Sequence, residues 1–464
     1  MIRSRLAIVA VLSGALAASG CAQTRDFLRL NDRTPKETAQ AENRISLVGF
    51  DQEVTPEEGL KGASFYLPDP VAIDQWALPG GVPEQSPPHA DAAKALSVAW
   101  KRGFGTARGR NAHVMAPPVA VNGKIYVMDG HATVSALDAR TGAQVWKADL
   151  RGKLKRDTVA FGGGLAISEG KLVVTSGYRF ISQLDADTGA VLWRTQTEQP
   201  IHAAPTVSGG RIFVVAVDNT LLTFDFATGK EGWTYQALSE PARLLAASSP
   251  AVSGDTVVAA FGSGELVALR AANGNDLWSE ALSRASRTNA LSEIRDIAGR
   301  PVIYQGDVVA VSHSGVLSST DLRTGSTRWS LPVTGVTTPW VSGDVVYVVD
   351  RAGKLYCLAR ETGLAYWVTD LGVGREKSGF LPSLGGGSKS KKKKAKDRPV
   401  WSSPILASGR LLLASNRGEM VAVNARTGEV ERSVDLGGSV TVGPIALGES
   451  VYFVTDEARL IAVR

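Results

Sequence analysis

The segments Leu137-Asp-Ala-Arg-Thr-Gly-Ala-Gln-Val-Trp146 and Leu184-Asp-Ala-Asp-Thr-Gly-Ala-Val-Leu-Trp193 are two copies of one pattern. Further copies end at Trp233, Trp278, Trp329 and Trp367, and a seventh copy has Arg432 in place of the tryptophan. The motif glycines, 38 to 65 residues apart, are Gly142, Gly189, Gly229, Gly274, Gly325, Gly363 and Gly428. A period near 40 residues is typical of a fold built from similar units.

The chemistry of each motif residue predicts a structural role for it. The carboxylates of Asp138 and Asp185 can accept backbone N–H hydrogen bonds in a turn, and the glycine that follows allows positive φ there. The tryptophan, four residues after the glycine, begins a strand and is placed to pack between neighbouring units. We therefore expect core packing, rather than ligand binding, for these tryptophans.

The segments upstream of each motif predict short strands joined by glycine turns, as in Ala120-Val-Asn-Gly-Lys-Ile-Tyr-Val-Met-Asp129. Each unit is therefore expected to be a four-stranded antiparallel meander. Because one meander cannot bury both of its faces, the units must stack, and a ring closes the stack. The sequence predicts an all-β fold, a β-propeller.

The two ends of the repeat region predict how the ring closes. The last unit, Val442 to Arg464, stops after three strands, where a turn motif would begin. The missing outer strand is available at Ala95-Leu-Ser-Val-Ala-Trp100-Lys101. Seven motifs and one split unit make an eight-bladed propeller over residues 96–464, in which N- and C-terminal strands pair and remove exposed sheet edges.

The first 20 residues have the pattern of a signal peptide. Arg3 and Arg5 precede an apolar run from Leu6 to Ala18, about 13 residues long and too short to span a bilayer. The small residues before Cys21 resemble a bacterial lipobox, which implies removal of residues 1–20 and lipidation of Cys21; the alternative is an ordinary signal peptide with an incidental cysteine. Residues 21–95 are rich in Pro, Glu, Asp and Thr and are expected to form an extended tether, with the patch from Trp76 to Gly81 docking on the propeller.

The charge of the chain is concentrated in two segments. The 464 residues carry a formal net charge of +6, with 51 Lys and Arg against 45 Asp and Glu. Six lysines lie in one insertion at residues 385–398, and Arg3 and Arg5 lie in the signal. The remainder of the chain is slightly negative, so the basic balance does not indicate a nucleic-acid partner.

The residue types that commonly bind metals or catalyse reactions show no recognisable spacing in this sequence. His89, His113, His131, His202 and His313 have no ligand spacing, and the cysteines number two, Cys21 and Cys357. Cys357 lies in an alternating, strand-like segment and is expected to be buried. We expect no catalytic residues, no metal and no cofactor.

The Asp-x-x-Thr-Gly-x-x-x-Trp unit resembles the repeat of pyrroloquinoline-quinone-type propellers. With the lipobox and eight blades, the chain is similar to the BamB family, lipoproteins of the outer-membrane β-barrel assembly (BAM) machinery. This resemblance implies a non-enzymatic scaffold, lipid-anchored in the outer membrane and facing the periplasm. It also implies binding to the periplasmic domains of BamA and to other assembly subunits, and assistance in folding and inserting outer-membrane proteins, with unfolded clients as further candidate partners.

The resemblance also implies which residues contact BamA. The family uses two neighbouring interblade connections, which correspond here to Pro241–Leu245 and Ser292–Asp296. Leu244 and Asp296 match an apolar and an acidic contact position, while Ala242, Leu245 and Ala298 depart from the family pattern. The expected partner-binding residues are Arg243, Leu244, Leu245, Glu293, Arg295 and Asp296. The other interpretation is that the two leucines cap the core.

Two other functions fit the repeat. One is a quinoprotein dehydrogenase, although those enzymes often carry an adjacent cysteine pair that this chain lacks. The other is a propeller that binds polysaccharide or another envelope ligand through exposed aromatics such as Trp340 and Trp401. The repeat is specific evidence for the fold but weak evidence for the function.

Overall fold

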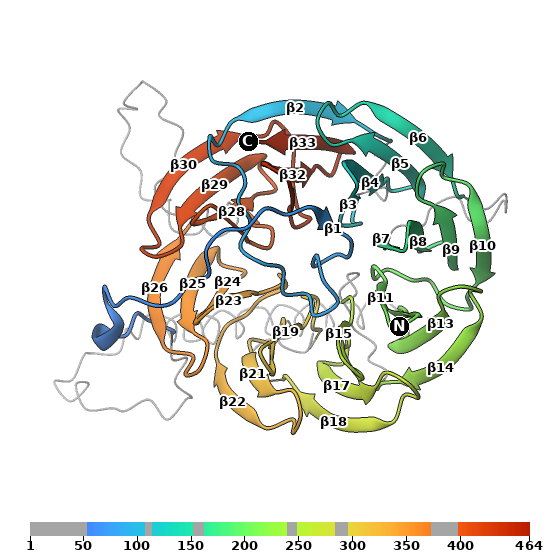
Figure 1. Ribbon diagram of the computed structural model, residues 1–464. Helices are drawn as coiled ribbons and strands as arrows, with labels where there is room; N and C mark the ends of the chain where they lie inside the picture. The colour runs from blue at the N-terminus through green and yellow to red at the C-terminus, as the bar shows by residue number, and fades with distance from the viewer. Residues whose placement is uncertain (1–52, 107–113, 152–161, 239–247, 284–295, 373–397) are drawn as a thin grey trace, which may run out of the picture. The chain divides into compact units, whose positions relative to one another are not determined.

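The protein forms a ring of eight four-stranded antiparallel blades around a central axis, and in the first blade a short strand from residues 75–76 adds a fifth strand to the sheet (Figure 1). The computed structural model describes residues 53–106, 114–151, 162–238, 248–283, 296–372 and 398–464. The predicted eight-bladed propeller is confirmed. Among the described residues, no helix is long and apolar enough to cross a membrane, and the short 3-10 helix η2 spans Glu58–Leu60.

Each blade runs from an innermost strand to an outermost one. The innermost strands are β3 (Val119–Val121), β7 (Gly163–Ser168), β11 (Thr206–Ser208), β15 (Ala251–Ser253), β19 (Val302–Tyr304), β23 (Trp340–Ser342), β27 (Ile405–Ala407) and β31 (Ile445–Leu447). The second strands are β4 (Lys124–Met128), β8 (Lys171–Ser176), β12 (Arg211–Val215), β16 (Thr256–Ala260), β20 (Asp307–Val311), β24 (Val345–Val349), β28 (Arg410–Ala414) and β32 (Ser450–Val454).

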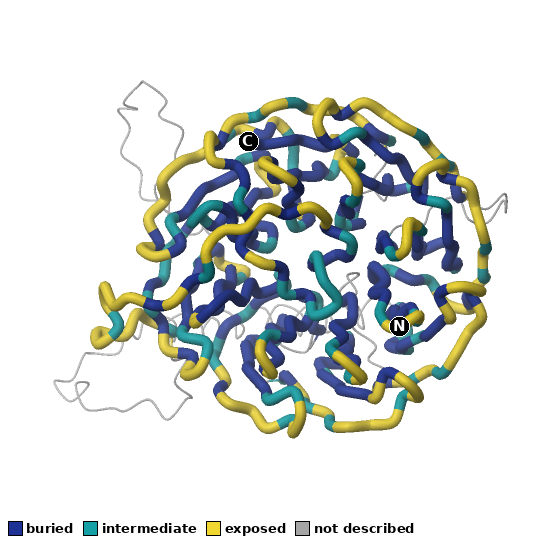
Figure 2. The backbone as a smooth tube through the Cα atoms, viewed as in Figure 1, coloured by how far each residue is buried: buried dark blue, intermediate teal, exposed yellow. Residues whose placement is uncertain are grey.

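The third strands are β5 (Thr133–Asp138), β9 (Phe180–Asp185), β13 (Thr220–Asp225), β17 (Glu265–Arg270), β21 (Leu317–Asp321), β25 (Lys354–Ala359), β29 (Glu419–Asn424) and β33 (Arg459–Val463). The outermost strands are β6 (Gln144–Asp149), β10 (Val191–Gln196), β14 (Glu231–Gln236), β18 (Asp276–Ala281), β22 (Thr327–Leu331), β26 (Ala365–Asp370), β30 (Val430–Asp435) and, in blade 8, β2 (Val98–Gly103). Burial follows this order, since the second and third strands are mostly buried and the outer rim is exposed (Figure 2).

The ring is closed by the pairing expected from the sequence. Strand β2 pairs antiparallel with β33, so that Trp100 lies opposite Ala462 and Lys101 opposite Ile461. Ser97 and Arg464 exchange two backbone hydrogen bonds of 2.9 Å beside this pair. Blade 8 therefore combines the two ends of the repeat region in one sheet.

The motif tryptophan of each blade packs on the motif glycine of the next blade. A Cβ atom added to Gly189 would lie 2.6 Å from Trp146 Cε3, and one added to Gly229 would lie 2.4 Å from Trp193 Cε3. The same contact occurs between Gly142 and Trp100, which belongs to the split blade. These glycines all have φ between 68° and 77°. Both the backbone conformation and the contact therefore exclude a side chain at this position.

Most motif tryptophans also donate a hydrogen bond across the same interface. The indole Nε1 of Trp146 donates to the carbonyl of Ala186 at 2.9 Å, and Trp278 Nε1 donates to Leu322 at 2.8 Å. The same bond is formed by Trp233, Trp329 and Trp367. In Trp100 and Trp193 the Nε1 atom is buried without a partner. The predicted packing of the tryptophans between units is observed at each of these blades.

The turn before each motif glycine is organised by the preceding aspartate. Asp138 Oδ1 accepts hydrogen bonds from the backbone N–H of Thr141 at 2.8 Å and from its hydroxyl at 2.6 Å. Asp185, Asp225 and Asp321 make the same pair of bonds. These bonds stabilise the ionised form, so the pKa of each of these four carboxyls lies below its ordinary value.

Residues 65–93 pack against the propeller, which corrects the prediction of an extended tether for this part of the chain. Phe65, Leu67, Ile73, Trp76 and Leu78 are buried. Strand β1 (Gln75–Trp76) pairs with β3, and Trp76 stacks on Trp340 with ring centroids 6.4 Å apart. The docking of the Trp76 patch is thus observed, and it extends over far more chain than expected. The signal, Cys21 and most of the 385–398 insertion lie outside the described residues.

This segment, residues 65–93, forms hydrogen bonds to all eight blades. The bonds run to the innermost strand or the turn after it in each blade, through Val121, Ile167, Thr206, Val252, Ile303, Asp344, Leu406 and Gly448. Most of these partners lie toward the ends of the innermost strands. The segment therefore crosses the axis at the face that carries the turn motifs (Figure 1).

Two single variants, Gly189→Ala and Gly170→Ala, separate the effect of backbone strain on stability from the effect of the tryptophan contact. Both glycines lie in blade 2, with φ of 75° and 70°, but a Cβ atom at Gly170 would meet nothing within 4 Å. We expect Gly170→Ala to lower the free energy of unfolding by about 1 kcal/mol through strain. Gly189→Ala should cost roughly 2–4 kcal/mol, because overpacking against Trp146 is added. Urea denaturation measures both, and equal losses would contradict the role given to the contact.

The motif aspartates predict a loss of stability in acid. Because their pKa values are lower in the folded chain, their contribution is present at neutral pH and is lost as the pH falls through those values. Asn424 occupies the motif position in blade 7 and still accepts the N–H of Thr427 at 3.1 Å, so asparagine preserves the turn. Replacing Asp138, Asp185, Asp225 and Asp321 with Asn should flatten the dependence of the unfolding free energy on pH between about pH 5 and pH 2. If urea titrations at several pH values gave the same dependence of the unfolding free energy on pH as in the unmodified chain, these carboxylates would not contribute to the loss of stability in acid.

Candidate functional site

The interblade connections, each from an outermost strand to the next innermost strand, mark one face of the ring. The turns between second and third strands lie beside them, as shown by the bond from Leu282 N to the Gly264 carbonyl at 2.8 Å. The opposite face carries the turn motifs and residues 65–93. Loops on a rigid scaffold are where binding usually resides, so the face of the connections is the candidate binding face.

The connection between blades 3 and 4 starts at an anchored residue. Leu238 donates its N–H to Glu265 Oε2 at 2.9 Å, and its carbonyl accepts a bond from Asn219 Nδ2 at 2.7 Å. Its side chain is 67% exposed. The turns of blades 3 and 4 therefore hold the backbone while the leucine points outward. The sequence analysis did not single out Asn219. The signal that could have identified it is the Asp218-Asn219 pair, typical of a turn, in which Asn219 has a positive φ of 66°.

The connection between blades 4 and 5 begins and returns in the core. Leu282 is 1% exposed and its carbonyl accepts a bond from Ser314 Oγ at 3.0 Å. At the return, Ile297 is 1% exposed and its N–H donates to the Phe261 carbonyl at 3.3 Å. Both ends of this connection are therefore fixed to the turns of blades 4 and 5.

The two connections meet where they re-enter the ring. Ser248, the first described residue after the blade 3–4 connection, donates its hydroxyl to the carbonyl of Gly299 at 3.1 Å. Ser248 is buried, so the bond is shielded from water. The structure therefore brings together the described return ends of the two connections that contain the predicted partner segments.

Of the six predicted partner-binding residues, the structure describes Asp296. Asp296 is 2% exposed, and its backbone carbonyl accepts a hydrogen bond from the N–H of His313 at 2.9 Å. This burial differs from the exposed position expected of a contact residue. Arg243, Leu244, Leu245, Glu293 and Arg295 lie outside the described residues.

The aromatic residues suggested for ligand binding are buried. Trp340 and Trp401 are 6% and 4% exposed. Trp340 lies on innermost strand β23, where it stacks on Trp76. The expectation of exposed aromatics at these two positions is therefore wrong, because residues 65–93 cover the first and the interblade packing covers the second.

Within the described ranges, no cluster of three or more His, Cys, Asp or Glu side chains is arranged to hold a metal ion. Cys357 is buried on β25, as expected, and burial raises the pKa of its thiol. It lies beside Tyr347, whose hydroxyl donates to the Ala425 carbonyl at 2.9 Å. Cys357 is a packing residue of the core.

A comparison with known protein families identifies the family of this chain. The family described as outer membrane protein assembly factor BamB matches residues 130–369 and 389–464. The chain belongs to the BamB family. A second family, the β-propeller domain of glucose, ethanol and alcohol dehydrogenases, matches residues 89–166.

Individual relatives agree with this family. BamB from Burkholderia pseudomallei is 27% identical over 336 residues, covering 68% of this chain and 86% of the relative. BamB from Escherichia coli is 23% identical over 365 residues, covering 78% and 87%. The crystal structure of BamB from Moraxella catarrhalis covers 79% of this chain and 99% of its own, with a TM-score of 0.65 and 17% identity. A europium-containing methanol dehydrogenase has the same TM-score at 15% identity, which reflects the shared fold.

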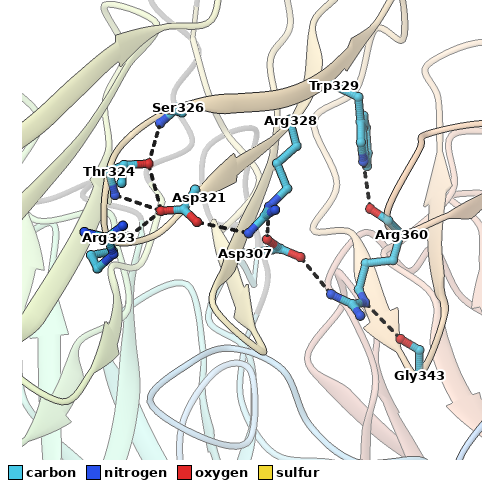
Figure 3. A network of polar contacts seen from close by, with 9 residues as sticks. All are labelled: Asp307, Asp321, Arg323, Thr324, Ser326, Arg328, Trp329, Gly343 and Arg360. Atoms are coloured by element: carbon cyan, nitrogen blue, oxygen red, sulfur yellow. Dashed lines mark hydrogen bonds and ion pairs between the residues drawn. The ribbon is translucent and has the colours of Figure 1, made fainter.

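A buried charge network fixes blade 5, which receives the blade 4–5 connection, to blade 6. Asp307 accepts a bond from Arg360 Nη1 at 2.7 Å and pairs with Arg328 (Figure 3). Arg360 Nε donates to the Gly343 carbonyl at 3.1 Å, and Trp329 Nε1 donates to the Arg360 carbonyl. Asp307 and Arg360 are 4% and 12% exposed at their side chains. Their attraction is therefore weakly screened by water.

Replacing Asp307 with Asn should destabilise the protein strongly. The change leaves the buried guanidinium of Arg360 without its counter-charge, which costs about 3 kcal/mol of unfolding free energy. The matched control is Asp255→Asn, because Asp255 and Arg270 form a pair in which both side chains are 51% exposed. That control should cost less than about 1 kcal/mol. Similar losses in the two variants, measured by denaturant unfolding, would show that burial does not strengthen the Asp307 network.

Proposed function

We propose that this BamB-family protein is a non-enzymatic scaffold subunit of the outer-membrane β-barrel assembly machinery and binds BamA through the face of the interblade connections. Family membership over most of the chain carries the proposal. The Ser248–Gly299 bond supports it, because it brings together the described ends of the connections that contain the predicted residues. A rigid ring then serves to hold the described ends of the two connections beside each other.

The proposal includes an outer-membrane location facing the periplasm. The N-terminal sequence, with a short apolar run before Cys21, supports cleavage and lipidation at that residue. More than one acyl chain gives stable membrane attachment where a single chain gives marginal binding. The protein would then assist folding and insertion of outer-membrane proteins by its contact with BamA, other assembly subunits and unfolded clients.

A binding experiment on the blade 3–4 connection tests the proposal. The double variant Leu244→Asp/Leu245→Asp introduces two charges into the predicted apolar contact and should weaken binding to the periplasmic domains of BamA at least tenfold. The control is Leu192→Asp, which makes the same change at a 49% exposed leucine of outermost strand β10. Surface plasmon resonance with immobilised BamA domains measures the affinities. Equal affinities of the double variant and the unmodified chain would reject this contact.

The alternative of a quinoprotein dehydrogenase has the support of the second family match over residues 89–166 and of the shared fold. Tight, stoichiometric quinone binding by the purified chain, or quinone-dependent reduction of a dye, would favour the enzyme. Copurification of the membrane-anchored protein with barrel-assembly subunits would favour the scaffold.

A further inference from the structure

The residue before the proline that opens an innermost strand is a hydrogen-bond donor in four consecutive blades. Blades 4 to 7 have Ser249, Arg300, Thr338 and Ser403 at this position, directly before Pro250, Pro301, Pro339 and Pro404. In blades 3 and 8 the equivalent residues are Ala204 and Gly443. The innermost strands surround the axis (Figure 1), and each of the four donors lies just before an innermost strand, so the donors form an arc around one side of it. The arc lies where the interblade connections re-enter the ring.

Hydrogen bonds join the three members of this arc in blades 5 to 7. The N–H of Arg300 donates to Thr338 Oγ1 at 3.1 Å, and the N–H of Thr338 donates to Ser403 Oγ at 2.9 Å. Each hydroxyl accepts one of these bonds, so its own O–H remains a donor. Neither O–H donates to an acceptor in the described part of the chain. Thr338 Oγ1 therefore lies beside the backbone of Arg300, and Ser403 Oγ beside that of Thr338, each with an O–H that has no acceptor among the described residues.

The guanidinium of Arg300 has no counter-charge among the described residues. Its Nε atom is shielded from solvent and makes no hydrogen bond, and none of the salt bridges between described residues includes it. The arginines of the Asp307 network, by contrast, are all paired. Burial lowers the pKa of Arg300 to about 10, which leaves it charged at neutral pH. Arg300 as a whole is partly exposed, so its charge is desolvated only in part and an anion can reach the guanidinium. A partly desolvated charge without a partner among the described residues is unfavourable, and an anion would remove this penalty.

We propose that Arg300, with the hydroxyls of Thr338 and Ser403, binds an oxyanion near the propeller axis, at the face of the interblade connections. A phosphate or a carboxylate has the oxygen acceptors that these donors lack, and arginine recognises both in a planar, two-bonded geometry. The anion is either a free inorganic ion or the side-chain carboxylate of a binding partner. This site does not depend on the proposed contact with BamA, which uses residues of the connections themselves.

The site is tested by anion binding to the purified full chain. Inorganic phosphate and propionate, a mimic of a side-chain carboxylate, are titrated at constant ionic strength maintained with chloride. We expect one of them to raise the thermal unfolding midpoint above that in chloride and to bind with one-to-one stoichiometry in calorimetry. Phosphate binding alone would indicate an inorganic ion, and propionate binding alone a partner carboxylate.

Three variants assign the binding to the arc. Arg300→Gln should lower the anion affinity at least tenfold and, in chloride, raise the unfolding midpoint, because the unpaired charge is removed. Thr338→Val should weaken binding while leaving the charge in place. The control Arg270→Gln removes an exposed arginine and should bind as the unmodified chain does. Absence of a midpoint shift with either anion, or an equal shift in Arg300→Gln, would overturn the proposal.

Discussion

The contact of each motif tryptophan with the glycine of the next blade is the interaction on which the ring depends. A four-stranded meander has two faces to cover, and the indole covers the turn of its neighbour only because the glycine has no Cβ. The same glycine takes a positive φ, so one residue type satisfies the turn and the contact. Each blade therefore stabilises the next, and no blade is complete on its own.

The interface between blades 7 and 8 shows what happens where this contact cannot form. Blade 8 is split, so its third strand, β33, pairs with β2 from the N-terminal part of the chain instead of with a strand that follows it through a motif turn. The preceding blade has Arg432 where the others have tryptophan, and Arg432 Nη1 donates to the carbonyl of Ala95 at 3.1 Å. A long polar side chain thus reaches the chain just before β2, as an indole N–H reaches the next turn elsewhere. The departure from the repeat fits the place where the chain ends meet.

The repeat was sufficient to predict the architecture because its residues act locally and recur. Asp138, Gly142 and Trp146 each have a chemistry that allows one position in a meander, and seven copies fix the blade number once the split blade is counted. Residues 65–93 could not be predicted in this way, because their bonds go to eight separate blades and leave no period in the sequence. Asp296 was placed by its alignment with a contact position, but its burial depends on packing against the turn of blade 5. Arg300 and its hydroxyl neighbours are distant in sequence and meet only in the ring.

The two faces of the ring are unequal for a physical reason. Residues 65–93 bond to every blade at the face of the turn motifs, and these bonds satisfy N–H and C=O groups at the free edges of innermost strands. That face is therefore tied to the N-terminal part of the chain. The other face keeps the interblade connections, anchored by Asn219, Glu265 and Ser248. Since residues 65–93 cover the innermost strands on the first face, the second face, where the connections begin and return, is the one that we propose binds partners.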